Sequence, residues 1–168
     1  SLQPKLEFRS GMKANALALP NGVIVFTDDF VNLTKTDDEL IAVLFHELGH
    51  LTHKHMTQRI IQDAMLTIMV VFITGDVETL DIVTGLPTLL LDLAYSREFE
   101  TEADIYALTL LKKHDIPLNS FVDAMSNLEN YYRKENEGST SSAMNEFFST
   151  HPITAERIKL VEQFTSAD

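Results

Sequence analysis

The sequence feature that most constrains the fold is a five-residue run at positions 46–50, His-Glu-Leu-Gly-His, inside an apolar-periodic segment that spans residues 37–59. The run reads H-E-x-x-H, and residues four apart on a helix lie on one face, one turn apart. His46 and His50 can therefore offer ring nitrogens to one metal ion, while Glu47 lies beside that ion without binding it. The segment predicts a buried helix that carries the polar residues of a metal site.

These residue types suit the chemistry of zinc. Neutral imidazoles are good ligands for Zn²⁺, and a catalytic zinc usually has three protein ligands and an open fourth position. Water at that position becomes far more acidic, with a pKa of roughly 7 in favourable sites. Glu47 can take its proton and later pass a proton to a leaving amine. The same pattern also occurs where two histidines are ordinary core residues, so other parts of the sequence are needed to distinguish a metal site from core histidines.

Composition limits the partners and the chemistry of the chain. Its 168 residues are 45% hydrophobic, which fits one compact domain over residues 1–168. A net charge of −12 disfavours nucleic acid and anionic membrane surfaces as partners. Because cysteine is absent, zinc would have to be bound by histidine and carboxylate side chains. The chain begins at Ser1 without a signal-like segment, so we expect a domain excised from a longer protein.

The pattern of apolar residues predicts an α+β fold that is mainly helical. Runs at 6–9, 15–19 and 23–27 predict strands, and Pro-Asn-Gly at 20–22 is typical of a hairpin turn. A small N-terminal sheet thus precedes the motif helix. Further helices are predicted at residues 28–33, 96–113, 119–135 and from residue 152 to about 164.

The residues that flank the motif have simple structural interpretations. Thr36 and Glu39 fit a capping box, in which each side chain satisfies a free backbone N–H at the start of the helix. The two aspartates between them suit the positive end of the helix dipole, so we interpret them as structural residues rather than metal ligands. His53 and His55 follow the motif, and we expect both to face solvent or the rim of the site.

Two apolar runs, at residues 64–75 and 82–91, carry no charge. As helices of 12 and 10 residues they are too short to span about 30 Å of hydrocarbon. We therefore predict two buried core helices or a helical hairpin, and no membrane-spanning helix. The alternative is an apolar surface that dips into a membrane or faces the substrate.

Two histidines do not complete a catalytic zinc site, so a third ligand is needed. The metzincin continuation H-x-x-G-x-x-H fails, because positions 53 and 56 hold histidine and methionine. The remaining solution is a carboxylate from the helix predicted at 96–113. There Glu100 and Asp104 share a face beside the apolar side, whereas Glu98 and Glu102 share another. Spacing favours Glu100 as the ligand without excluding Glu98, and Asp104 would orient a ligand imidazole.

Three blocks of sequence carry a family resemblance. They are His-Glu-Leu-Gly-His at 46–50, Ser-Arg-Glu-Phe-Glu-Thr-Glu-Ala-Asp at 96–104, and Ser-Thr-His-Pro at 149–152 followed by Glu-Arg-Ile at 156–158. In this order they resemble the signature blocks of metallopeptidase family 48, which includes the HtpX-like, BepA-like, Oma-type and CaaX prenyl endopeptidases. Residues 15–27 are similar to the strand pair that usually precedes them. The resemblance implies a zincin-like fold over nearly the whole chain.

The resemblance also implies roles for individual residues. His46, His50 and Glu100 match the ligands of one Zn²⁺ per chain, and Glu47 matches the general base and acid. Asp104 matches the aspartate that lies behind the ligands.

The third block holds two further candidates. His151 matches a histidine near the metal, which binds it in a latent state or polarises the substrate carbonyl, and Arg157 matches an arginine packed close to that histidine. The plainer interpretations are that His151 ends a loop before Pro152 at the start of a helix, and that Arg157 is an exposed helix residue. The Gly-Ser-Thr-Ser loop within residues 137–142 is either a lid over the cleft or an inert linker.

The sequence therefore predicts a zinc metalloendopeptidase that cleaves protein substrates, including misfolded, membrane or envelope proteins, by a zinc-activated water with Glu47 as general base. An extended polypeptide would add to the sheet along residues 14–19. The alternative is a catalytically silent, zinc-containing domain that binds unfolded or membrane proteins through residues 60–91. Cleavage of prenyl peptides would need a chamber built from membrane-spanning helices. Because we expect no spanning helix in this chain, we do not predict that activity.

The location of the domain is predicted by analogy alone. Relatives with a short core of this kind are often tethered to membranes, so we expect anchoring through segments outside this chain. The domain itself would lie on the extracytoplasmic, periplasmic side of a bacterial inner membrane. The sequence gives no indication of the oligomeric state.

Overall fold

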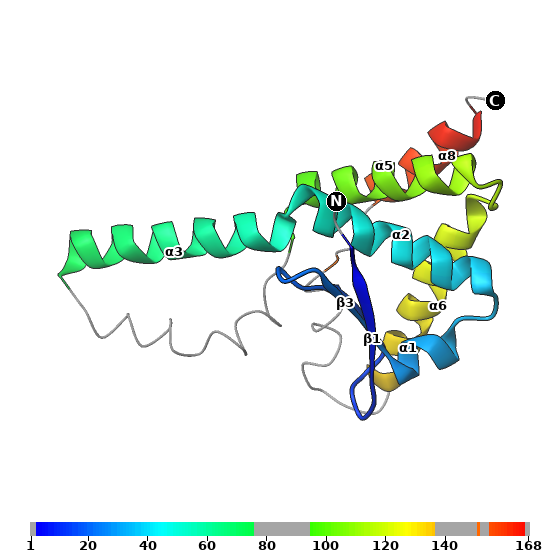
Figure 1. The fold of residues 1–168 in the computed structure, drawn as a ribbon, viewed down its shortest axis with the longest axis horizontal. Helices are drawn as coiled ribbons and strands as arrows, with labels where there is room; N and C mark the ends of the chain where they lie inside the picture. Colours follow the sequence, from blue (N-terminus) through cyan, green and yellow to red (C-terminus); the bar gives the residue numbers. More distant parts are fainter. Residues whose placement is uncertain (1–2, 76–94, 137–150, 152–154, 167–168) are drawn as a thin grey trace.

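A small N-terminal sheet and a set of longer helices make up the computed structural model, which describes residues 3–75, 95–136, 151 and 155–166. This arrangement confirms the predicted α+β, mainly helical fold (Figure 1). In chain order the described elements are β1 (Lys5–Arg9), β2 (Ala16–Ala18), β3 (Val23–Thr27), α1 (Asp28–Leu33), α2 (Asp37–His53), α3 (His55–Thr74), α5 (Arg97–Lys113), α6 (Asn119–Asn136) and α8 (Ala155–Ser166).

The sheet has the order β1-β3-β2, so β3 is its central strand. β2 and β3 are antiparallel and form the predicted hairpin, whereas β1 runs parallel to β3. The turn between β2 and β3 places Gly22 at a φ of 88°, a conformation that glycine adopts without strain. β3 leads directly into α1, where the Thr27 hydroxyl accepts a hydrogen bond from the Phe30 N–H at 3.2 Å.

The motif helix α2 lies at the centre of the fold, with the sheet and α6 on one side and α5 on the other (Figure 1). One apolar cluster joins Ile24 and Phe26 of the sheet, Val43 of α2 and Leu128 of α6. A second cluster joins α2 to α5, α6 and α8 through Ala42, Leu108, Leu111, Phe121 and Val161. Because both faces of α2 are covered, the polar residues of the motif are removed from bulk water.

The N-terminal end of α2 matches the prediction, and the C-terminal end differs from it. The Thr36 hydroxyl accepts a hydrogen bond from the Glu39 N–H at 3.3 Å, while the Glu39 carboxylate accepts one from the Lys35 N–H at 3.1 Å. The helix was predicted to continue to residue 59, and this is wrong. Lys54 adopts a left-handed conformation with φ 57°, which ends α2 at His53, and a new helix begins at His55.

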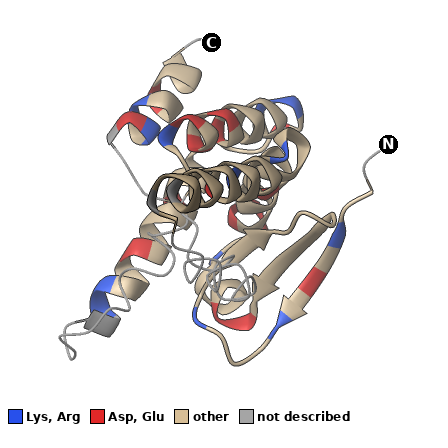
Figure 2. Cartoon of the chain, turned by 90° about the vertical axis from the view of Figure 1, so that its left-hand side faces the viewer, with Lys and Arg blue, Asp and Glu red and all other residues tan. Residues whose placement is uncertain are grey.

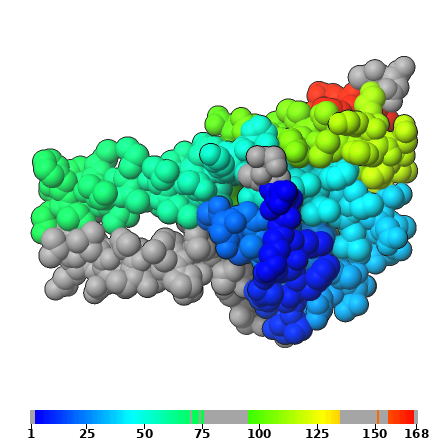
Figure 3. All heavy atoms as spheres, viewed as in Figure 1, coloured from blue at the N-terminus to red at the C-terminus, as the bar shows by residue number. Residues whose placement is uncertain are grey.

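The helix α3 contradicts the prediction that residues 64–75 form a buried core helix. It projects from the rest of the described chain (Figures 1 and 3). The stretch His55–Ile73 is long and apolar enough to cross a membrane, so the length argument against a spanning helix was also wrong. Its large apolar side chains are between 54% and 90% exposed: Ile61, Met65, Leu66, Ile68, Met69, Phe72 and Ile73.

Two other predictions lie outside the described residues. They are the apolar run at residues 82–91 and the loop at residues 137–142. The charge-free run at residues 64–75 begins after a stretch that includes the charged residues Arg59 and Asp63. In the structure those preceding residues belong to the same helix as the apolar run, which gives α3 its 20 residues.

Candidate metal centre and active site

The inner face of α2 carries the three polar residues of the H-E-x-x-H motif. His46, Glu47 and His50 are buried, with 4%, 1% and 1% of their surface exposed. The Nε2 atoms of His46 and His50 lie 3.0 Å apart. The four-residue spacing on one helical face therefore places the two imidazoles as the sequence predicts, and it leaves Glu47 on the same turn.

Close packing between α2 and α5 brings the second helix to this pair. A Cβ atom added at Gly49 would lie 2.8 Å from the Cα of Ala103 and 3.0 Å from its carbonyl oxygen. Both of those atoms belong to the α5 backbone, so only glycine permits this approach. Ala103 lies three residues after Glu100, and the contact therefore holds the carboxylate of Glu100 near the imidazoles.

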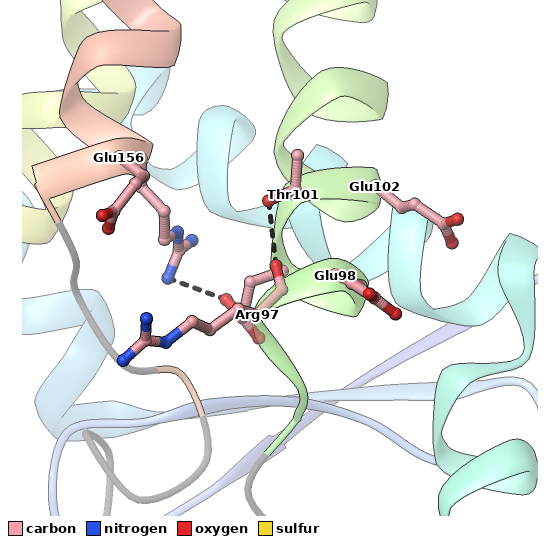
Figure 4. Close-up of a pocket in the computed structure, with 7 residues that line it drawn as sticks. Arg97, Glu98, Thr101, Glu102 and Glu156 are labelled. Carbon is pink, nitrogen blue, oxygen red and sulfur yellow. Dashed lines mark hydrogen bonds and ion pairs between the residues drawn. The ribbon is translucent and has the colours of Figure 1, made fainter.

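The structure distinguishes between the two carboxylates that spacing left open. Glu100 is 1% exposed, and its oxygens lie 3.5 Å from His46 Nε2 and 3.3 Å from His50 Nε2. Glu98 is exposed and points to the same side of α5 as Glu102 (Figure 4). Of these two residues, the geometry brings only Glu100 to the histidine pair.

His151 joins the same group from the far end of the chain. It is 1% exposed, and its Nδ1 lies 3.0 Å from Glu100 Oε1 and 3.4 Å from His46 Nε2. Its Nε2 lies 3.6 Å from Glu47 Oε1. One potential ligand atom from each of His46, His50, Glu100 and His151 lies within 4.8 Å of every other. The interpretation of His151 as a mere loop end does not account for this position.

Asp104 and Arg157 form a buried layer behind these residues. Asp104 Oδ1 lies 2.9 Å from His46 Nδ1. Arg157 donates hydrogen bonds from Nε and Nη2 to the two Asp104 oxygens at 2.6 and 2.7 Å, and its Nη1 lies 2.7 Å from Glu100 Oε2. Arg157 is 5% exposed, so the plainer interpretation of an exposed helix residue is excluded. One guanidinium thus fixes two carboxylates at once.

The donor set fits a divalent metal ion. The Asp104 carboxylate oxygen 2.9 Å from His46 Nδ1 favours the proton on this nitrogen, which leaves the lone pair of His46 Nε2 directed at the group. The carboxylate oxygens of Glu100 also present only lone pairs, and they face the same point. A cation bound between such atoms would remove their mutual repulsion, and imidazole with carboxylate is a ligand set that Zn²⁺ accepts.

Burial and charge set the protonation of the group. Burial alone would raise the pKa of Glu100, but the neighbouring His151 and Arg157 hold it well below its ordinary value. Burial lowers the pKa of His50 well below its ordinary value, so this imidazole is neutral at pH 7. Burial would also lower the pKa of His151, but the Glu100 and Glu47 carboxylates raise it overall. An ionised carboxylate and a neutral imidazole are the forms that bind metal.

Two residues at the site were not predicted from sequence. Tyr95 is 3% exposed and its ring stacks on His50, with centroids 4.0 Å apart. Burial, with smaller contributions from Glu47 and Glu100, raises the pKa of Tyr95 well above its usual range, so the phenol is neutral. His55 is fully buried, and its Nδ1 lies 2.9 Å from His50 Nδ1. The expectation that His55 faces solvent or the rim is therefore wrong, whereas His53 is exposed as predicted.

A pocket of about 480 Å³ opens beside the first turns of α5, between that helix and α8. Glu100 and Arg157 form its inner wall, so the pocket reaches the layer behind the ligand group. Figure 4 shows Glu156 of α8 across the pocket from Glu98 and Glu102. Arg97 and Thr101 complete the described lining.

The arrangement of these residues indicates a class of protein. A helix that carries H-E-x-x-H, joined by a glutamate from a second helix, is an arrangement typical of metallopeptidases. The profile described as Peptidase family M48 matches residues 3–165, and the chain belongs to this family. This confirms the resemblance that the three sequence blocks carry.

Curated relatives agree with the family. The chain is 31% identical over 149 residues to the mitochondrial metalloendopeptidase OMA1 of Arabidopsis thaliana. The aligned region covers 89% of this chain and 29% of the relative. The chain is 29% identical over 154 residues to OMA1 of Schizosaccharomyces pombe, covering 89% and 43%. It is 30% identical over 161 residues to the metalloprotease LoiP of Escherichia coli, covering 92% and 60%. The chain thus spans less than two thirds of each of these relatives.

Proposed function

We propose that residues 1–168 form the single catalytic domain of a zinc-dependent metalloendopeptidase that hydrolyses peptide bonds in protein substrates. The observation that carries this proposal is the convergence of Glu100 from α5 on the two imidazoles of α2. Glu47 lies on the same turn of α2 and is not needed as a ligand. Family membership and the names of the relatives support a peptidase that depends on a metal.

In this proposal His46, His50 and Glu100 bind one Zn²⁺ per chain. Two imidazoles and one carboxylate match the three-ligand sites of catalytic zinc, and the chain has no cysteine to offer instead. Bound zinc would act as a Lewis acid that polarises the scissile carbonyl and lowers the pKa of water. Asp104 fixes the tautomer of His46, and Arg157 fixes the orientation of Asp104 and Glu100.

Glu47 is the proposed general base and acid. Its carboxylate is 1% exposed, and its Oε1 lies 3.6 Å from Nε2 of His151, a member of the candidate ligand group. It would take a proton from the attacking water and deliver one to the departing nitrogen. Arg157 is 5% exposed and lies behind the ligands, so we propose that it acts by positioning Glu100 and Asp104.

His151 is the proposed fourth protein donor of a latent state. Its Nδ1 lies within the ligand group, 3.4 Å from His46 Nε2, where it would compete with water for the metal. The alternative role is that the ring, which lies near Glu47, donates a hydrogen bond to the developing oxyanion. A His151→Ala variant should cleave a short peptide faster than the wild type. Slower cleavage would instead mean that His151 acts only by polarising the scissile carbonyl of the substrate.

The two edges of the sheet differ in their suitability for binding an extended substrate. The edge strand β1 alternates Lys5, Glu7 and Arg9 (Figure 2), a pattern that discourages the addition of another strand. The opposite edge, β2 (Ala16–Ala18), carries no charge, and its three residues are buried. Leu17 of β2 packs in one cluster with Tyr95, which stacks on His50. We therefore propose that an extended polypeptide adds along residues 14–19 and presents its backbone to the site.

Substrate class and location also belong to the proposal. The relatives named OMA1 are described as mitochondrial, whereas LoiP comes from a bacterium. We propose a membrane-anchored full-length protein that acts in protein quality control on misfolded, membrane or envelope proteins. Placement on the periplasmic side of a bacterial inner membrane stays a prediction.

One substitution tests the division of roles. Glu47→Gln keeps the size of the side chain but removes the base, so hydrolysis of casein should fall to the level of the chelator-treated enzyme while zinc content stays at one per chain. Glu98→Gln removes an exposed carboxylate and should change neither property. Full activity of Glu47→Gln in a preparation free of contaminating protease would refute the mechanism.

A catalytically silent, zinc-containing domain that binds unfolded or membrane proteins is the second candidate. It is favoured by the exposed apolar surface of α3, which resembles a docking surface more than a solvent-facing helix. Casein separates the two candidates. Chelator-sensitive hydrolysis supports the peptidase, whereas binding of casein without any cleavage by the zinc-loaded chain supports the silent domain.

A further inference from the structure

Two side chains, His55 and Glu102, form a connected line with His50, and neither belongs to the proposed ligands or is the proposed base. His55 Nδ1 lies 2.9 Å from His50 Nδ1, and His55 Nε2 lies 3.0 Å from Glu102 Oε2. The His55 ring is fully buried and stacks on Phe99, with centroids 4.3 Å apart and planes 8° apart. Both ring nitrogens of His55 therefore have assigned partners, and the ring itself is fixed by packing.

The direction of the hydrogen bonds follows from what each group can do. An ionised carboxylate only accepts, so His55 Nε2 carries the proton that is donated to Glu102. In a neutral ring the other nitrogen then has a lone pair, so His55 Nδ1 accepts from His50 Nδ1–H. The remaining nitrogen of His50, Nε2, is left with its lone pair directed at His46 and Glu100.

We propose that His55 and Glu102 are positioning residues, which fix His50 in the tautomer and orientation needed to bind the metal through Nε2. This inference rests on the proposed function, because it assigns a role to residues around the same zinc site. Ligand histidines commonly donate their second N–H to an acceptor that sets the tautomer. Here the acceptor is a second histidine, which transmits the effect of a carboxylate.

The break between α2 and α3 makes this contact geometrically possible. In a continuous helix, five residues turn through about 500°, which would place residue 55 about 140° around the axis from His50. The left-handed Lys54 interrupts the helix and returns the chain so that His55 faces His50 instead. The unusual conformation of Lys54 therefore has a use at the site.

The two proposed imidazole ligands differ in their support. His46 faces Asp104 directly, and both Asp104 and its partner Arg157 are buried. His50 is supported through His55 by Glu102, whose side chain is 53% exposed. We therefore expect loss of the His55 acceptor to matter more than loss of the Glu102 charge, which water partly screens.

The same side chains suggest a competing arrangement, which the proposed directions of the hydrogen bonds oppose. His53, His55 and Glu102 have potential ligand atoms within 4.8 Å of one another and could hold a second ion. A metal on His55 Nε2 would leave the proton on Nδ1, directed at His50 Nδ1. His50 would then have to carry its own proton on Nε2, where the first metal binds. The proposal therefore predicts one zinc per chain.

Zinc affinity, measured by competition with a chromophoric chelator, tests the proposal. His55→Phe keeps the stacking on Phe99 but removes the acceptor, and it should weaken zinc binding about 10-fold to 100-fold. His55→Asn places an amide oxygen where Nδ1 was, so it should recover most of that loss. Glu102→Gln should weaken binding less than His55→Phe does, and the matched control Glu98→Gln should leave it unchanged. Circular dichroism checks that each variant is folded.

The tautomer can also be observed directly. In the zinc-loaded protein, long-range proton–nitrogen correlation spectra should show His50 protonated on Nδ1 and His55 protonated on Nε2. Unchanged zinc affinity in folded His55→Phe, the opposite tautomers, or a second zinc that His53→Ala removes would each overturn the proposal. If the zinc affinities and tautomers are as expected but no polypeptide is cleaved, the proposed function fails and the positioning role stands.

Discussion

The interface between α2 and α5 and the projecting helix α3 reverse the usual distribution of residues in opposite ways. At the interface, Glu47, Glu100 and Asp104 are at most 1% exposed, and Arg157 of α8, which pairs with two of them, is 5% exposed. Along α3, large apolar side chains reach 90% exposure at Phe72. Buried charges and exposed apolar patches are the informative departures from ordinary packing. The comparison teaches that buried, paired charges organise the first region, whereas the exposed apolar side chains of the second suit contact with an apolar partner.

The largest expected effect concerns the shared carboxylate of the interface. Glu100→Ala removes a proposed ligand and the partner of Arg157, so zinc should be lost and hydrolysis of casein should fall to the chelator-treated level. Zinc content by elemental analysis and the rate of casein cleavage check this outcome. Glu98→Ala, on a different face of the same helix, should retain both the zinc and the hydrolysis of casein. Loss of zinc in that variant would mean that the wrong carboxylate has been assigned.

A smaller but still large effect is expected from Arg157→Met, which leaves Asp104 and Glu100 without their buried cation. Breaking one partner out of a buried ionic group costs about 3–5 kcal/mol. Urea unfolding of the metal-free protein should show a loss of this size in the free energy of unfolding. Arg97→Met, at an exposed position, is the matched control. A loss below about 1 kcal/mol for Arg157→Met would show that the layer contributes little.

Gly49→Ala tests the backbone contact that joins the two helices. The added Cβ would meet the Ala103 backbone at 2.8 Å, so α2 and α5 would have to separate. Overpacking of this kind typically costs about 1–3 kcal/mol, and it should also weaken zinc binding by moving Glu100 from the histidines. Thr52 is exposed on the same helix, so Thr52→Ala should change neither the stability nor the zinc affinity. Wild-type stability and zinc affinity in Gly49→Ala would contradict the close approach.

The smallest expected effect on stability belongs to α3. Replacing Phe72 with serine removes a side chain that is 90% exposed, so the free energy of unfolding should change by less than about 0.5 kcal/mol. Sedimentation with phosphatidylcholine vesicles should decrease if this surface contacts lipid. A loss of stability above about 2 kcal/mol would instead show that α3 is packed as a core helix, which would remove the contrast between the two regions.

Local patterns in the sequence predicted those parts of the site whose geometry depends on one element at a time. The spacing of His46 and His50 sufficed to place them on one face, and Ser96 caps α5 as expected, accepting from the Phe99 N–H at 3.2 Å. Spacing along α5 correctly grouped Glu100 with Asp104. It could not separate Glu100 from Glu98, because that difference depends on how α5 packs against α2.

Two errors show where the sequence lacked a signal. Lysine rarely adopts a left-handed conformation, so nothing marked Lys54 as the end of α2, and the buried position of His55 could not be foreseen. The apolar composition of α3 is compatible with a core helix or with a helix exposed to a nonpolar environment. Composition cannot distinguish these, because the difference lies in which other surfaces are present to cover the helix.

The most direct test is the position of the metal. In crystals of the zinc-loaded protein, anomalous scattering at the zinc edge should give one peak per chain, bounded by His46 Nε2, His50 Nε2 and the Glu100 carboxylate. A carboxylate at position 100 that points away from both imidazoles, with no peak between them, would contradict the account. So would a single peak that lies instead between His53 and Glu102.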